Sequence, residues 1–84
     1  MLRITEEYME DGKTTIYMEG RIAGPWVEEV RRISQALLAA ENRLILDLAG
    51  VLFADRHGVA LLRELQPRAE LINCSPFLAE QLRH

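Results

Sequence analysis

Alternating hydrophobic and polar residues at the start of the chain predict two paired strands. Residues 2–9 place Leu2 and Ile4 between polar side chains, and residues 14–19 are rich in β-branched and aromatic side chains. The segment 10–13 between them contains Asp-Gly, and glycine tolerates the positive φ of a tight hairpin turn. We therefore expect an antiparallel hairpin.

A helical period follows, from Pro25 to about Ala40. Proline is favoured at the first helical position, where its missing N–H costs no hydrogen bond. The hydrophobic residues that share one face of this helix are Trp26, Val30, Ile33 and Leu37. This spacing predicts an amphipathic helix with that face against a core, and we interpret Trp26 as a core residue.

The next hydrophobic run, residues 44–48, does not alternate with polar residues. Such a strand is expected in the middle of a sheet, or where helices cover both faces of the sheet. After a short loop, a second helix is predicted over residues 56–66. Asp55 is its expected N-cap, and Pro67 ends it because proline cannot donate to the helical ladder.

The end of the chain adds a short strand over residues 69–73 and a third helix, for which Ser75 is the expected N-cap. The predicted order is therefore β-β-α-β-α-β-α. Strands that are separated by helices pair in parallel through crossover connections. We expect an α/β fold with a small four-stranded mixed sheet, helices packed on it and the first strand antiparallel at an edge. A chain of 84 residues is sized for a single domain, residues 1–84.

Composition narrows the classes of function. The chain carries 10 basic and 13 acidic residues, a net charge of −3, and no basic patch interleaved with aromatic side chains, which argues against nucleic-acid binding. Its hydrophobic runs are too short for a membrane span, and its start lacks the apolar core of a signal peptide. The single cysteine, Cys74, cannot form an internal disulfide, so we expect a reducing, cytoplasmic compartment.

Few residues offer catalytic or metal-binding chemistry. The two histidines, His57 and His84, lie apart in the sequence without clustered ligands, so no metal site is predicted. There is no glycine-rich phosphate loop and no nucleophile–base pair, and we expect neither an enzyme nor a cofactor. The candidate site is instead the junction between the strand that ends near Asp47 and the helix that begins after Asp55. Free backbone N–H groups at such a junction can meet an anion or a partner protein.

Several motifs of the chain, taken together, resemble a STAS domain, the fold of bacterial anti-sigma factor antagonists. The matching segments are Leu46-Asp47-Leu48, then Val51-x-Phe53-x-Asp55-x-x-Gly58 followed by Val59-Ala60-Leu61-Leu62, and Ile72-Asn73-Cys74-Ser75-Pro76. With the hairpin they cover nearly the whole chain in the right order. The resemblance implies a regulatory module that binds other proteins and acts in bacterial signalling, by partner switching that regulates transcription.

The resemblance also implies a phosphorylation site that this chain has lost. In the family, the loop before the second helix typically reads Asp-Ser-Ser-Gly or Asp-Ser-Thr-Gly, and a partner serine kinase phosphorylates the hydroxyl residue before the glycine. The corresponding residues here are Asp55, Arg56, His57 and Gly58. His57 stands at the phosphoacceptor position and both hydroxyl groups are missing, so serine phosphorylation is chemically impossible there.

By this resemblance, we expect a partner-binding surface over residues 54–62 and a kinase-like anti-sigma factor as its partner. The residues expected to form it are Asp55, Arg56, His57, Gly58 and Leu61. Asp47 and Ser75 are expected to support the neighbouring loops through their side chains.

Other functions stay open at this point. Small STAS proteins also resemble accessory subunits that dock on the ATPase of lipid-transporting ABC systems, and a small-molecule or nucleotide binder is a further alternative. A homodimer is open as well, because a short chain can leave apolar surface uncovered. Met9, Met18 and Leu52 are candidates for such a surface.

Overall fold

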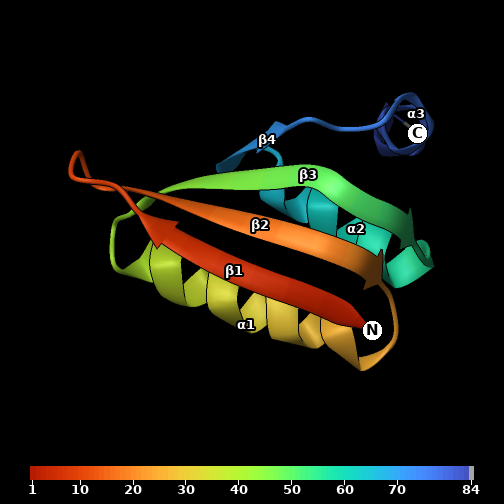
Figure 1. Cartoon of the computed structure of the whole chain (residues 1–84), viewed down its shortest axis with the longest axis horizontal. Coiled ribbons are helices and arrows are strands. Elements are labelled where there is room, and N and C mark those ends of the chain that lie inside the picture. The colour runs from red at the N-terminus through yellow and green to blue at the C-terminus, as the bar shows by residue number, and fades with distance from the viewer. Residues whose placement is uncertain (84) are drawn as a thin grey trace.

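The computed structural model describes residues 1–83 and has the predicted order of elements (Figure 1). The elements are β1 (Leu2–Tyr8), β2 (Lys13–Ile22), α1 (Pro25–Ala39), β3 (Arg43–Ala54), α2 (Arg56–Leu65), β4 (Ala69–Ile72) and α3 (Pro76–Arg83). They form a four-stranded sheet in the order β1-β2-β3-β4. β1 is antiparallel to β2, and the other neighbours are parallel. The predicted α/β fold with a mixed sheet is confirmed.

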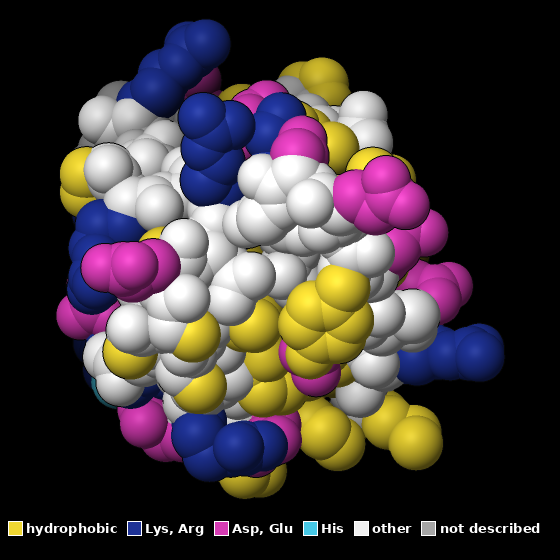
Figure 2. Space-filling model, turned by 90° about the vertical axis from the view of Figure 1, so that its left-hand side faces the viewer, with side chains coloured by type: hydrophobic (Ala, Val, Ile, Leu, Met, Phe, Trp, Pro, Cys, Tyr) yellow, Lys and Arg dark blue, Asp and Glu magenta, His cyan; other side chains and the backbone are white. Residues whose placement is uncertain are grey.

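The β1–β2 hairpin closes on its Asp-Gly turn. Gly12 adopts a positive φ of 82°, and the Met9 N–H donates to the Lys13 carbonyl at 2.8 Å. The pairing then runs from Tyr8 opposite Thr14 to Leu2 opposite Gly20. Figure 2 looks at this end of the molecule and shows hydrophobic side chains gathered in its lower half, at the height of β1 and α1.

The helices α1 and α2 lie on one face of the sheet, and the other face is open in Figure 1. β3 lies in the middle of this sheet, between β2 and β4. Along β3, Leu44, Leu46 and Leu48 are buried, whereas Ile45 and Asp47 between them are half-buried. The unbroken hydrophobic run therefore reflects a central strand rather than helices on both faces.

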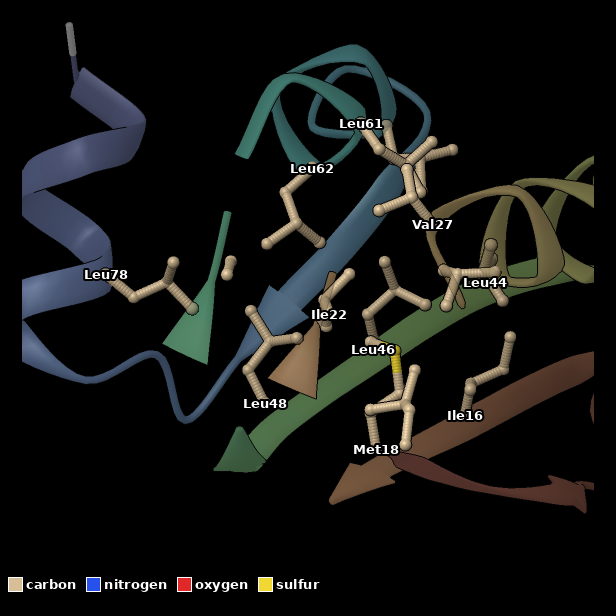
Figure 3. Close-up of a cluster of buried hydrophobic side chains, with 14 of the residues drawn as sticks. Ile16, Met18, Ile22, Val27, Leu44, Leu46, Leu48, Leu61, Leu62 and Leu78 are labelled. Atoms are coloured by element: carbon tan, nitrogen blue, oxygen red, sulfur yellow. The ribbon is translucent and has the colours of Figure 1, made fainter. Parts of the chain in front are cut away.

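The core fills the space between the sheet and its helices (Figure 3). Ile16, Met18 and Ile22 enter it from β2, and Leu61 and Leu62 enter it from α2. Met18 has only 1% of its surface exposed, so it cannot contribute to a dimer surface as proposed from the sequence. Met9 and Leu52, the other two candidates, are exposed.

The face that α1 buries differs slightly from the prediction. Its buried residues are Val27, Val30, Ser34 and Leu37. Trp26 and Ile33 are only half-buried and lie at the margin of the core. The buried stripe is rotated toward Val27 and Ser34, on the side where α1 packs against β2 and β3. The sequence period alone does not fix that rotation.

β3 is longer than predicted, and the prediction of a loop before the second helix is wrong, because Asp55 alone separates β3 from α2. The strand runs on to Ala54 because it keeps pairing with β2 as far as Ile22. Two register shifts interrupt this pairing, the first between Tyr17 and Glu19 of β2. Such irregularities bend a strand and re-aim its side chains, and the affected part of β3 leads directly into the candidate site.

Candidate functional site

Asp55 connects two strand-to-helix junctions, the one before α1 and the one before α2. It is the N-cap of α2, and its Oδ1 atom accepts a hydrogen bond from the Gly58 N–H at 2.7 Å. Its Oδ2 atom accepts from the N–H of Gly24, the N-cap of α1, at 3.2 Å. The Asp55 N–H in turn donates to the Ile22 carbonyl at 3.2 Å. One aspartate thus holds the starts of two helices against the end of β2.

These hydrogen bonds lower the pKa of the Asp55 carboxyl below its usual value. The Gly58 N–H contributes most and the Gly24 N–H comes next, and the nearby His57 lowers the pKa further. A carboxyl group whose pKa is lowered by folding stabilises the folded state where it is ionised. The stabilisation by Asp55 is fully present at pH values above the pKa that this carboxyl has in the unfolded chain. It is lost as the pH falls through the lower pKa that the carboxyl has in the folded state.

We therefore expect Asp55→Asn to lower the free energy of unfolding near neutral pH, by an amount that shrinks as the solution is acidified. Asparagine is also a good N-cap, so the substitution tests the charge rather than the capping geometry. Urea denaturation over a pH series measures the effect. Ser75→Ala is the control, because the Ser75 Oγ atom caps α3 by accepting from the Leu78 N–H at 3.1 Å and carries no charge. Its cost of about 1 kcal/mol should be independent of pH.

Gly58 lies where α2 touches the end of β2. It is buried in the first turn of α2, and a Cβ atom built on it would stand 2.2 Å from the Ile22 carbonyl oxygen. No side chain fits at that distance. The glycine shared with the family pattern is thus explained by close packing of α2 on β2.

Arg56 and His57 are both exposed in the first turn of α2. Within residues 1–83, no hydrogen bond or ion pair holds the Arg56 side chain. A cation at a helix N-terminus faces the positive end of the helix dipole, which disfavours it slightly. Arg56 therefore gains no stabilisation from its position and is available for an external contact.

Leu61 does not belong to the exposed surface, and its predicted role there is wrong. Its side chain is fully buried, with 0% exposed. Leu61, Leu62 and Leu65 form the face of α2 that lies on the sheet. The sequence motif placed Leu61 near the surface residues, but the helix turns its side chain into the core.

Asp47, in β3, is hydrogen-bonded to Asn73, the residue that follows β4. The Asp47 Oδ1 atom accepts from the Ala49 N–H at 3.0 Å and from the Asn73 side-chain amide at 3.2 Å. Ala49 lies at the first register shift of β3, where a backbone N–H leaves the regular ladder. Asn73 has a positive φ of 58°, which ends β4 one residue earlier than predicted. Asp47 is thus a structural contact.

Two exposed hydrophobic residues precede Asp55. Leu52 is 82% exposed and Phe53 is 44% exposed, although both lie in β3. The guanidinium of Arg21, on the neighbouring strand β2, lies 5.8 Å from the centre of the Phe53 ring. That distance is within the range of a cation–π interaction.

A groove of about 620 Å³ continues from this pair along α2. Its lining residues are Phe53, Ala54, Asp55, Arg56, Val59, Ala60, Arg63 and Gln81. Arg63 crosses to α3, where its guanidinium donates to the Gln81 carbonyl at 2.6 Å. We call Leu52, Phe53 and these groove residues the β3–α2 surface. It combines an apolar floor with arginines, in a chain of net charge −3.

Sequence reasoning missed much of the β3–α2 surface. It assigned Asp55, Arg56, His57 and Gly58 to the site, and the structure brings these together at one junction. Phe53 and Arg63 were not assigned. One signal was available, because the run Val51-Leu52-Phe53-Ala54 has more successive hydrophobic residues than a strand with one covered face can bury.

Membrane-spanning helices and clusters of metal-binding side chains are both absent from residues 1–83. None of their helices is both long and apolar enough to cross a bilayer. Within the same residues, His, Cys, Asp and Glu side chains nowhere form a group of three suited to a metal ion.

Comparison with known proteins identifies the fold. No protein-family model matches the chain, and no curated protein matches it significantly. Among solved structures, the chain is similar to the anti-sigma factor antagonist SpoIIAA in its unphosphorylated form, with a TM-score of 0.74 and 26% sequence identity over 96% of this chain and 82% of that chain. The likeness supports a regulatory module of this type. The chain is a STAS-like domain with the fold of an anti-sigma factor antagonist.

Proposed function

We propose that this protein is a binding module that recognises a regulatory protein through the β3–α2 surface. The observation that carries the proposal is the exposure of Leu52 and Phe53 beside a groove at the start of α2. Large hydrophobic side chains exposed next to a groove are typical of protein interaction sites. By its likeness to SpoIIAA, the partner is a kinase-like anti-sigma factor.

The charges of the β3–α2 surface favour an acidic partner. Arg21, Arg56 and Arg63 surround the apolar residues, and arginine is enriched at the centres of protein interfaces. Arg56 extends from the first turn of α2, where no acidic side chain of residues 1–83 forms an ion pair with it. The partner segment that fits is therefore amphipathic, with a hydrophobic face and carboxylates beside it.

The complex is not switched by serine phosphorylation. The site reads Asp55, Arg56, His57 and Gly58, and none of these residues carries a hydroxyl group. We propose that the module binds its partner constitutively and acts as a fixed scaffold.

The binding test is titration of the partner into variants of the β3–α2 surface. The partner is first sought by co-purification from the host, and its affinity is measured by calorimetry. We expect Leu52→Ala and Arg56→Glu each to weaken binding by about tenfold, because each removes a contact at the edge of the groove. Arg68→Glu is the matched charge control, since Arg68 is exposed outside this surface, and it should bind as the wild type does.

Three results would contradict the proposal. Loss of binding in Arg68→Glu equal to that in Arg56→Glu would show an effect of net charge alone. Co-purification of a transporter ATPase would assign the module to a lipid-transport system instead. Tight binding of a nucleotide or metabolite, with no protein captured, would favour the small-molecule binder.

Restoring the hydroxyl group should restore the switch. In His57→Ser, a serine stands in the first turn of α2, where the helix N-terminus favours a phosphate. With a serine kinase of the anti-sigma factor class and ATP, we expect phosphate on His57→Ser and none on residues 56–58 of the wild type. Intact-protein mass spectrometry under mildly alkaline conditions, which preserve phosphohistidine, measures both. Phosphate on His57 of the wild type would overturn the constitutive scaffold.

A further inference from the structure

The outer edge of the sheet offers unpaired backbone groups. β1 is an edge strand with β2 on one side only. The hairpin bonds include Met9 N–H to the Lys13 carbonyl and Arg21 N–H to the Met1 carbonyl. Because bonded residues alternate along an antiparallel pair, the odd-numbered residues of β1 bond to β2. The N–H and C=O groups of Leu2, Ile4, Glu6 and Tyr8 therefore point outward, where a further strand can pair.

An open cleft follows the same edge between β1 and α1. Its lining residues are Leu2, Ile4, Glu6, Pro25, Trp26, Glu29 and Ile33. Three of its hydrophobic residues are only half-buried at the margin of the core: Ile4, Trp26 and Ile33. Figure 1 shows α1 running beside β1 along this edge. The edge lies across β2 from the β3–α2 surface.

We propose that β1 pairs with β1 of a second copy of this chain, antiparallel and centred on Thr5. A twofold axis through Thr5 and perpendicular to the sheet then makes one continuous sheet from the two copies. Such an interface is isologous, because each copy offers the same surface to the other. The helices of both copies lie on the same face of the joined sheet.

Charge selects this register. With Thr5 opposite the second copy's Thr5, Arg3 lies opposite the second copy's Glu7, and the twofold axis repeats this pair. Both are odd-numbered, so they occupy the non-hydrogen-bonded positions, where side chains approach closest. Opposite charges directly across two strands stabilise the pairing. Arg3 and Glu7 both project from the open face of the sheet, where Tyr17 donates to Glu7 at 3.0 Å.

The neighbouring registers are less favourable. Shifting the pairing by one position toward the end of β1 places Glu6 opposite the second copy's Glu6, and like charges directly across strands repel. Shifting it toward the start places Ile4 opposite Ile4 but leaves Arg3 facing an uncharged Thr5. Only the register centred on Thr5 pairs both charges.

The same register places an exposed aromatic ring over the cleft. Tyr8 lies opposite the second copy's Leu2, and the Tyr8 side chain is 67% exposed in the single chain. As an even-numbered residue it is on the helix side of β1, as are Leu2 and Ile4. Leu2 lines the cleft together with Pro25 and Trp26. Each Tyr8 ring thus covers the apolar cleft of the other copy. This contact favours the same register as the pairing of Arg3 with Glu7 does, and it does not depend on charge.

A disulfide across the twofold axis tests the register. In Thr5→Cys, made in a Cys74→Ala background, two thiols face each other at a non-hydrogen-bonded position, and oxidation by diamide should give a covalent dimer. The matched control, Arg3→Cys in the same background, faces Glu7 rather than a second thiol and should stay unlinked. Cross-linking of Arg3→Cys, or none of Thr5→Cys, would overturn the register.

Charge reversal tests the interface itself. Sedimentation equilibrium should show the wild type as a dimer, with Arg3→Glu and Glu7→Arg each raising the dissociation constant by about tenfold or more. The double variant Arg3→Glu/Glu7→Arg should recover the dimer, and Arg68→Glu should leave it unchanged. Circular dichroism verifies that each variant folds. A monomer at every concentration, or a double variant no better than the singles, would overturn the proposal. Partner affinity at the β3–α2 surface is expected to be the same in all four variants.

Discussion

Replacing Gly58 by alanine is expected to lower the free energy of unfolding by about 2–4 kcal/mol, a large effect for the addition of one methyl group. The added Cβ would stand 2.2 Å from the Ile22 carbonyl oxygen and 3.3 Å from the Cβ atom of Ala54. The carbonyl is backbone at the end of β2, so it cannot rotate away. α2 must move off the sheet, and the Asp55 Oδ1 bond to the Gly58 N–H lengthens with it. Urea denaturation followed by circular dichroism measures the change.

Ala60→Ser is the matched control for Gly58→Ala. It adds one heavy atom to α2 two residues further on, at a position that is exposed, and should change the free energy of unfolding by less than about 0.5 kcal/mol. A Gly58→Ala protein as stable as the wild type would show that α2 does not pack on β2 at this distance.

Local chemistry made most of the elements predictable. The Asp-Gly pair gives the hairpin turn, Pro25 begins α1, and Asp55 caps α2 through a hydrogen bond to a residue three positions on. Each of these features involves residues that are close in the sequence. The second hydrogen bond of Asp55, to the Gly24 N–H, could not be predicted because it joins residues 31 positions apart.

The candidate surface was harder to predict because exposure depends on how elements meet. Leu52 and Phe53 are hydrophobic and belong to a central strand, yet they are exposed where β3 runs past the register shifts of its pairing with β2. Arg21 comes near Phe53 only through that shifted register. Conversely, Leu61 belongs to the most recognisable motif and is buried. A linear motif identifies a junction but does not state which of its side chains face outward.

Leu61→Ala is expected to lower the free energy of unfolding by about 3 kcal/mol without weakening partner binding by the folded protein. Its side chain is fully buried in the core between α2 and the sheet, so truncation leaves a cavity there. Chemical denaturation gives the stability. Calorimetry at a temperature where the variant is fully folded gives the affinity.

Leu52→Ala makes the same chemical change at an exposed position and should have the opposite result. With 82% of its surface exposed, Leu52 contributes little to the core, and its truncation should cost less than about 1 kcal/mol of stability. We expect partner affinity to fall about tenfold instead, because the methyl groups of Leu52 become buried only in the complex. The pair therefore separates folding from binding within one motif. If Leu61→Ala lost affinity while keeping its stability, Leu61 would have to reach the surface, contrary to the packing of α2.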